Sequence, residues 1–222
     1  MVTKLLWRCP ICKTEDALSY KKKKFTPDSL ICNACSTVWE FSRTDEEDYY
    51  WRVSKGEQKD LELRLAEWYR KMKEGFKPQP LRAANLGLLS DEELYLISKS
   101  DKIKLVTQKT NPLFFSWNKP EFPLEESGKK PSPYMKSFGA GQLFLTSHRF
   151  LWKTKDNIHY FWADKIISIY AEAGLYLGIF YGSTKYKFRI HKESLVKWIT
   201  YSGSIAEETR IRSDHTILVS NY

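Results

Sequence analysis

The chain has 222 residues, of which 42% are hydrophobic, 15% aromatic and 28% charged. This balance indicates a globular protein with enough apolar bulk for one large domain or two smaller ones. It excludes disordered, collagenous and small disulfide-rich chains. No run approaches the roughly 18 apolar residues of a membrane-spanning helix. The apolar stretch at the N-terminus is too short for a signal peptide, so we expect a cytoplasmic protein.

The net charge is +9, from 36 Lys plus Arg against 27 Asp plus Glu. Residues 81–222 carry most of this excess, with twenty basic and fourteen acidic side chains, a net of +6. A basic surface favours an anionic partner. Phosphate on nucleic acid and phosphate on lipid headgroups are equal candidates on charge alone.

All four cysteines lie in the first 35 residues, as two Cys-x2-Cys pairs separated by nineteen residues: Cys9 with Cys12, and Cys32 with Cys35. This spacing is typical of a tetrahedral zinc site, because each pair forms a tight knuckle that directs two thiolates at one metal. Two disulfides are disfavoured because the chain shows no secretory signal. A redox-active Cys-x2-Cys motif is disfavoured because such a motif works as a single pair, and this chain has two. Residues 5–43 resemble a zinc ribbon with one structural Zn²⁺ and no open coordination position.

The insert between the two cysteine pairs is predicted to be a β-hairpin, and it carries a run of four lysines: Lys21, Lys22, Lys23 and Lys24. Lysines beside Tyr20 and Phe25 suit contacts with phosphates and stacking on a base, so nucleic-acid binding through the ribbon is one interpretation. The alternative is a solvated turn that keeps a small module soluble.

A connecting helix is predicted between Glu57 and Gly75. Its apolar side chains recur at helical spacing, and Gly75 with two following prolines signals its end; the stripe is Leu61, Leu65, Trp68 and Met72. Acidic and basic residues alternate around this stripe, so we expect it to pack against the protein core and not against a membrane.

The remaining chain is predicted to be mainly β. Several short strands with turn residues between them precede one amphipathic helix near Lys192, which indicates a partly open β-barrel capped by a helix. The expected fold class is α+β, mainly β. The expected division is a zinc ribbon, a connecting helix and linker, a barrel domain and a C-terminal tail, at 1–55, 56–82, 83–209 and 210–222.

The segment Gly141-Gln-Leu-Phe-Leu-Thr-Ser-His-Arg-Phe-Leu-Trp152 resembles the glycine–leucine–threonine–arginine signature of GRAM domains and bacterial pleckstrin-homology (PH)-like domains. In that signature a strand ends in Leu-Thr, a two-residue turn follows, and an arginine opens the next strand. Residues 89–95 and 163–169 resemble the family's opening segment and the strand after the signature. The resemblance implies a binding module for lipid headgroups or protein surfaces, without catalysis.

Two groups of cations are candidate anion or lipid ligands in this domain. Lys185, Lys187 and Arg189 alternate with apolar residues and are expected on one face of a strand. Lys129 and Lys130 lie in a proline-rich stretch predicted to be a loop. Together they suit a phosphorylated headgroup. The strand residues are equally well explained as an ordinary solvated face.

An enzymatic interpretation rests on two short motifs. His159 and Asp164 have the His-x4-Asp spacing of glycerolipid acyltransferases, and Glu207-Glu-Thr-Arg210 resembles a phosphate-binding motif of that family with Glu208 in place of its glycine. Motifs this short arise by chance. We therefore predict no catalytic residue and a non-enzymatic adaptor for anionic lipid or a protein partner at the cytoplasmic membrane face. A nucleic-acid-binding zinc-ribbon protein is the alternative, and an accessory region of an acyltransferase-type enzyme a lesser one.

Overall fold

The structure is a computed structural model that describes residues 6–24, 27–43, 49–82, 86–109, 135–172, 175–190 and 193–221. Within these ranges the chain is mainly β, with two open sheets and two α-helices. Neither described helix is long and apolar enough to cross a bilayer. The chain divides into two compact units, one of residues 1–78 with 194–200 and one of residues 79–193 with 201–222.

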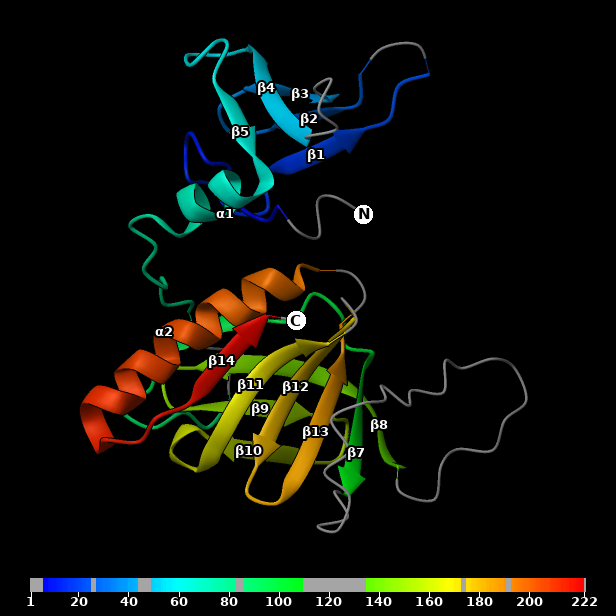
Figure 1. Ribbon diagram of the computed structural model, residues 1–222. Coiled ribbons are helices and arrows are strands. Elements are labelled where there is room, and N and C mark those ends of the chain that lie inside the picture. Colours follow the sequence, from blue (N-terminus) through cyan, green and yellow to red (C-terminus); the bar gives the residue numbers. More distant parts are fainter. Residues whose placement is uncertain are drawn as a thin grey trace, which may run out of the picture. The chain divides into compact units, whose positions relative to one another are not determined.

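The first unit is built on a five-stranded antiparallel sheet in which every strand pairs with the next one along the chain (Figure 1). The expected hairpin is formed by the first two strands, which join the two cysteine pairs. The strands are β1 (Leu18–Lys21), β2 (Ser29–Cys32), β3 (Val38–Arg43), β4 (Tyr49–Lys55) and β5 (Glu62–Arg64).

The connecting helix, α1, spans Leu65–Lys73 and begins later than the sequence predicts. The residues before it form β5, which pairs with β4, so strand pairing overrides the helical spacing there. The backbone amide of Arg64 donates to the Glu67 carboxylate at 2.9 Å, which closes the first helical turn. The helix buries Trp68 and Met72 in the same unit as the five-stranded sheet.

Three tryptophans form the centre of the first unit. Trp39 and Trp68 are fully buried, with ring centroids 4.5 Å apart, and Trp51 packs edge-on against Trp68. Aromatic side chains bury large areas, which lets a unit of about 80 residues form a core of its own.

The second unit is built on a nine-stranded sheet with the order β10-β9-β8-β7-β13-β12-β11-β14, in which β6 also pairs with β8. All of the pairs are antiparallel except β11 with β14. The strands are β6 (Leu94–Ile97), β7 (Ile103–Lys109), β8 (Met135–Thr146), β9 (Arg149–Lys153), β10 (Ile158–Trp162), β11 (Ile166–Glu172), β12 (Tyr176–Tyr181), β13 (Thr184–Arg189) and β14 (Leu218–Asn221). A 3₁₀ turn, η2 (Ala163–Lys165), joins β10 to β11.

The long strand β8 connects the two halves of this sheet. Its first part pairs with β7, and its last part pairs with β6 on one side and β9 on the other. The core of this unit consists of apolar side chains from these and the neighbouring strands, among them Leu105, Leu143, Phe150, Trp152, Ile169, Leu177 and Phe188.

The C-terminal segment is part of the fold and not a separate tail. Helix α2 spans Leu195–Ser213, beyond the expected end of the domain. Residues 214–217 then lead into β14, which lies parallel to β11 with Ser168 opposite Leu218. Helix α2 therefore continues across the boundary predicted at residue 209, and the residues after that boundary supply an edge strand.

Candidate metal centre

The two cysteine pairs fold into matching knuckles. In each, the residue after the second cysteine has a positive φ, 61° at Lys13 and 58° at Ser36. Its amide donates to the carbonyl of the first cysteine, at 3.0 Å for Cys9 and 2.9 Å for Cys32. The same local geometry thus presents each pair of thiols on one side of a tight turn.

The four thiol sulfurs form one cluster, within 4.8 Å of one another. Cys9 Sγ lies 3.9 Å from Cys35 Sγ, and Cys12 Sγ lies 3.6 Å from Cys32 Sγ. Thiolates bound tetrahedrally to zinc at about 2.3 Å lie roughly 3.8 Å apart. The cysteines are not joined as disulfides, and two of the four are buried. The donor set and its spacing fit a single structural zinc ion.

Two threonines support the thiols, and the sequence interpretation did not include them. The Thr14 hydroxyl lies 3.3 Å from Cys12 Sγ, and the Thr37 hydroxyl lies 3.1 Å from Cys35 Sγ. A metal-bound thiolate has no proton, so each hydroxyl is the donor in the loaded site. The signal for them is a repeated Cys-x2-Cys-x-Thr motif, at residues 9–14 and 32–37.

Three of the thiols differ in acidity. Burial raises the pKa of Cys9 and of Cys32. Burial also acts to raise the pKa of Cys12, but hydrogen bonds with Thr14, Cys35 and Cys32 together outweigh it and lower the pKa to about 7. Cys12 is therefore better prepared than Cys9 and Cys32 to meet a metal ion as a thiolate.

The first knuckle is also fastened to the C-terminal end of α1. Arg8 donates from Nε to the Lys13 carbonyl and from Nη1 to the Met72 carbonyl, both at 2.7 Å. Lys13 Nζ donates to the Lys71 carbonyl at 2.7 Å. Carbonyls in the last turn of a helix lack partners within the helix, so these side chains cap α1 from the metal site.

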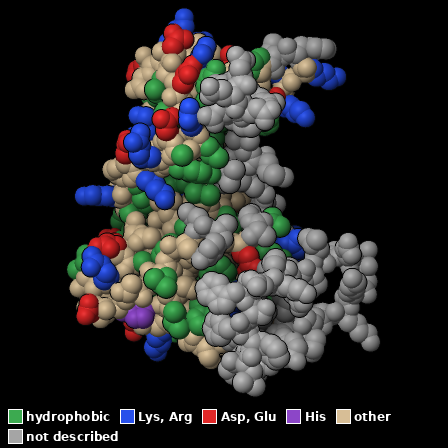
Figure 2. Space-filling view, viewed as in Figure 1, with side chains coloured by type: hydrophobic (Ala, Val, Ile, Leu, Met, Phe, Trp, Pro, Cys, Tyr) green, Lys and Arg blue, Asp and Glu red, His purple; other side chains and the backbone are tan. Residues whose placement is uncertain are grey.

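The predicted lysine run lies at the end of the β1–β2 hairpin, and all four side chains are exposed. Lys23 is 3.8 Å from the Glu40 carboxylate, a distance that leaves its charge solvated. Figure 2 shows Lys and Arg side chains projecting where this hairpin lies in Figure 1. Phe25, the aromatic expected beside them, lies outside the described residues.

The second predicted group of cations does not form a solvated face. Lys187 is only 2% exposed, and its Nζ lies 3.1 Å from a Glu172 carboxylate oxygen. Lys185 and Arg189 are half-buried, with Lys185 Nζ 4.9 Å from the centre of the Tyr170 ring. Alternation along the strand gave no sign that Lys187 is buried against a carboxylate. Lys129 and Lys130 lie outside the described residues.

The segment that resembles the GRAM signature forms the expected strand, turn and strand. β8 ends at Thr146, Ser147 and His148 make the turn, and Arg149 opens β9. Gly141 approaches β9 so closely that a Cβ there would lie 2.5 Å from the Lys153 carbonyl oxygen. The Thr146 hydroxyl donates to Glu92 at 2.6 Å.

The residues with acyltransferase-like spacing make other contacts. The His159 imidazole packs against the rings of Trp152 and Phe138, with centroids 5.4 and 5.7 Å apart. Across the described part of the chain, no hydrogen bond or ion pair joins His159 to Asp164. Glu207 and Arg210 pair with each other on the surface of α2.

Three comparisons with known proteins found no counterpart: no protein-family model, no curated protein sequence and no solved structure matches this chain.

Proposed function

We propose that this chain is a non-enzymatic binding protein whose zinc-stabilised ribbon presents a lysine hairpin to a phosphate-bearing polymer, with nucleic acid as the first candidate. The observation that carries the proposal is the position of the lysines. Lys21 to Lys24 are exposed at the end of a hairpin that joins the two metal-binding knuckles. A metal that holds both knuckles in place also fixes the base of this hairpin.

Contacts between lysines and phosphates release condensed counterions, and this makes them a source of affinity without sequence specificity. The hairpin brings four such side chains together, and the long-range attraction of the basic chain supports the encounter. In this proposal zinc has a structural role, because four thiolates complete its coordination.

The competing proposal is that the second unit is a GRAM or PH-like domain that binds anionic lipid or a protein at the cytoplasmic membrane face. Its support is that the glycine, threonine and arginine of the signature each have a structural role, together with Glu92 from the expected opening segment. The burial of Lys187 weakens the headgroup site predicted on β13, since this ammonium group already has a carboxylate partner.

The test compares binding of the full, zinc-loaded chain to single-stranded DNA, double-stranded DNA and anionic vesicles under matched salt. Replacing Lys21, Lys22, Lys23 and Lys24 by Ser is expected to weaken nucleic-acid binding and to lower its log–log salt slope by about 3. The matched control removes four other exposed lysines of the first unit, Lys55, Lys59, Lys73 and Lys77. It loses the same charge and should retain most of the slope.

The variant Lys185→Gln/Arg189→Gln tests the competing proposal without disturbing the buried Lys187. Vesicle binding that this variant abolishes, with no nucleic-acid binding by the wild type, would replace the first proposal by the second. Equal losses in the hairpin variant and its matched control would mean that net charge, and not the hairpin, attracts the ligand.

A further inference from the structure

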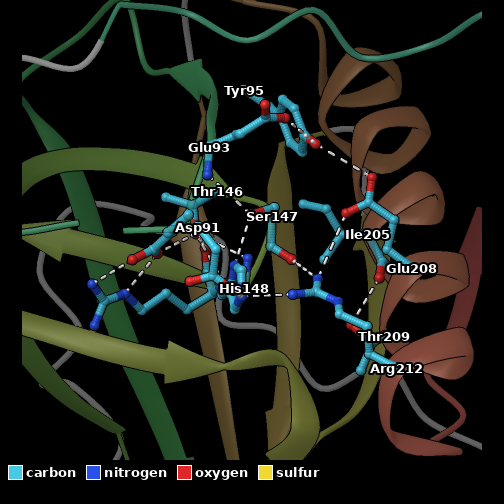
Figure 3. Close-up of polar contacts among 12 residues, drawn as sticks. Asp91, Glu93, Tyr95, Thr146, Ser147, His148, Ile205, Glu208, Thr209 and Arg212 are labelled. Atoms are coloured by element: carbon cyan, nitrogen blue, oxygen red, sulfur yellow. Dashed lines mark hydrogen bonds and ion pairs between the residues drawn. The ribbon is translucent and has the colours of Figure 1, made fainter. Parts of the chain in front are cut away.

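The His148 side chain lies where three elements of the second unit meet (Figure 3). It belongs to the turn between β8 and β9, and its side chain is 18% exposed. Its Nδ1 is 2.7 Å from the Ser147 hydroxyl. Its Nε2 is 2.6 Å from Arg212 Nη1 on α2 and 3.3 Å from the carboxylate of Asp91, which precedes β6.

The contact with Arg212 defines the protonation state of the ring. A guanidinium group can only donate, so Nε2 must supply a lone pair and the ring must be neutral. The ring proton is then on Nδ1 and is donated to the Ser147 hydroxyl oxygen. Arg212 also donates from Nη2 to the Ser147 carbonyl at 2.5 Å, which attaches the last turn of α2 to this turn of the sheet.

A second proton on the His148 ring changes Nε2 from a hydrogen-bond acceptor into a donor. The protonated nitrogen can no longer accept from Arg212, and two cationic groups would then lie 2.6 Å apart. The same N–H can donate to the Asp91 carboxylate at 3.3 Å, a charge-assisted bond that the ring cannot make while its Nε2 accepts from Arg212. Arg212 and Asp91 therefore compete for one nitrogen, and the proton selects between them.

We propose that His148 is a proton-controlled latch. The neutral ring holds the C-terminal end of α2 through Arg212, and the protonated ring exchanges Arg212 for Asp91 and releases that end of the helix. Histidine is the side chain type used most often for proton-controlled contacts near neutral pH.

The neighbouring groups keep their contacts through this change. The Tyr95 hydroxyl lies 3.0 Å from a Glu93 carboxylate oxygen and 3.3 Å from one of Glu208, and these two acceptors share its one proton. Burial and the Glu208 charge raise the pKa of Tyr95, so its hydroxyl remains protonated. Glu208 also lies 3.6 Å from Arg212 and holds that guanidinium near α2 after release.

Two further groups are close to these elements. Arg149 is paired with Glu92 in a closed, buried contact. His215, between α2 and β14, donates from Nε2 to the Ile166 carbonyl at 2.7 Å. An imidazole makes this bond in both its neutral and its cationic form, so protonation of His215 does not break it.

Ser147, His148 and Asp91 are the residue types of a catalytic triad, but their geometry does not suit one. Ser147 is 5% exposed, and its hydroxyl oxygen already accepts from the Glu93 amide at 3.0 Å. A nucleophile has to reach a substrate carbonyl, and this hydroxyl is enclosed. The cluster is built to hold α2.

Amide hydrogen exchange of the full, zinc-loaded chain at pH 7.5 and pH 5.5, corrected for intrinsic exchange rates, tests the latch. We expect protection of residues 208–213 to fall about tenfold or more at the lower pH, the size expected for a lost hydrogen bond to a charged group. Protection of β11 and β12 should not change. Unchanged protection of residues 208–213 would overturn the proposal.

Variants separate the latch from general acid sensitivity. His148→Gln keeps a side-chain acceptor that cannot be protonated. In this variant the protection of residues 208–213 should be the same at both pH values. Arg212→Gln should leave the end of α2 less protected at both pH values. His159→Gln is the matched control and should behave as wild type, since His159 packs among aromatic rings. A pH effect that persists in His148→Gln would contradict the assignment.

Discussion

Arg149 and Glu92 form a two-pronged ion pair in the interior of the second unit. Arg149 Nε lies 2.8 Å from one carboxylate oxygen of Glu92, and Nη2 lies 2.8 Å from the other. The side chains are 5% and 0% exposed. The guanidinium group also lies between the rings of Tyr160 and Trp162, 4.6 and 4.4 Å from their centres. The pair thus joins the segment before β6 to the start of β9.

Removing one member of this pair leaves the other as a buried charge without its partner. We expect Arg149→Ala to lower the free energy of unfolding by about 3–5 kcal/mol, measured by urea denaturation of the zinc-loaded chain. The double variant Arg149→Met/Glu92→Leu should recover much of this loss. Arg210→Ala is the control for an exposed pair and should have almost no effect. Equal effects of the two alanine variants would contradict the structural role of Arg149.

Lys187 gives the unfolding free energy a pH dependence of known sign. Burial lowers the pKa of Lys187 to about 8, although Glu172 opposes the shift. The unfolded chain retains the ordinary pKa, so between pH 8 and about 10.4 it binds more protons than the folded chain. Stability should therefore rise with pH across this window, and the cost of burying the cation is fully present below pH 8.

The double variant Lys187→Met/Glu172→Leu isolates this contribution from other groups that titrate in the same range. The difference in unfolding free energy between wild type and variant should change by at most about 3 kcal/mol from pH 8 to pH 10.4. Parallel stability curves over this range would show that Lys187 is not buried as a cation.

Thr14 and Thr37 are expected to strengthen metal binding. Loss of a group that supports a metal ligand typically costs about 10–100-fold in affinity. We expect Thr14→Ala and Thr37→Ala each to weaken zinc binding in this range, measured by competition with a chromogenic chelator. Ser42→Ala, on β3 of the same unit, is the control. Unchanged affinity in both threonine variants would show that the hydroxyls do not support the site.

Metal removal should also loosen α1. The first knuckle supplies the side chains that cap the helix, Arg8 and Lys13, and these depend on the knuckle for their positions. Chelation is expected to increase amide exchange in residues 65–73, and Arg8→Gln should do so with zinc still bound. Lys73→Gln, an exposed position at the end of α1, is the control. If chelation left α1 as protected as before, the metal site and the helix would be independent.

The sequence predicted features that depend on local spacing and missed those that depend on what covers a surface. The four cysteines and the turn at Ser147–His148 follow from motifs of a few residues. The strand β5 replaced the first part of the predicted helix because β4 offered a pairing partner. Alternation along β13 placed Lys187 on a side of the strand, but no local pattern predicts its pairing with Glu172.

The edge strand β14 has a similar explanation. Four residues of mixed polarity give little strand signal by themselves, and their parallel pairing with β11 joins segments about 50 residues apart. The two threonines beside the thiols were different, since the repeated Cys-x2-Cys-x-Thr motif is visible in the sequence. Local patterns in the sequence therefore predict the metal centre more completely than they predict the strand pairing in the second unit's sheet.

The central claim is that the four cysteines hold one zinc ion. The most direct measurement is the metal content of freshly purified full-length chain, by elemental analysis together with native mass spectrometry. We predict one zinc per chain with four reduced cysteines, and its loss in Cys9→Ser/Cys32→Ser. Protein that contains no stoichiometric zinc, or whose mass shows Cys9 joined to Cys12 as a disulfide, would contradict the account.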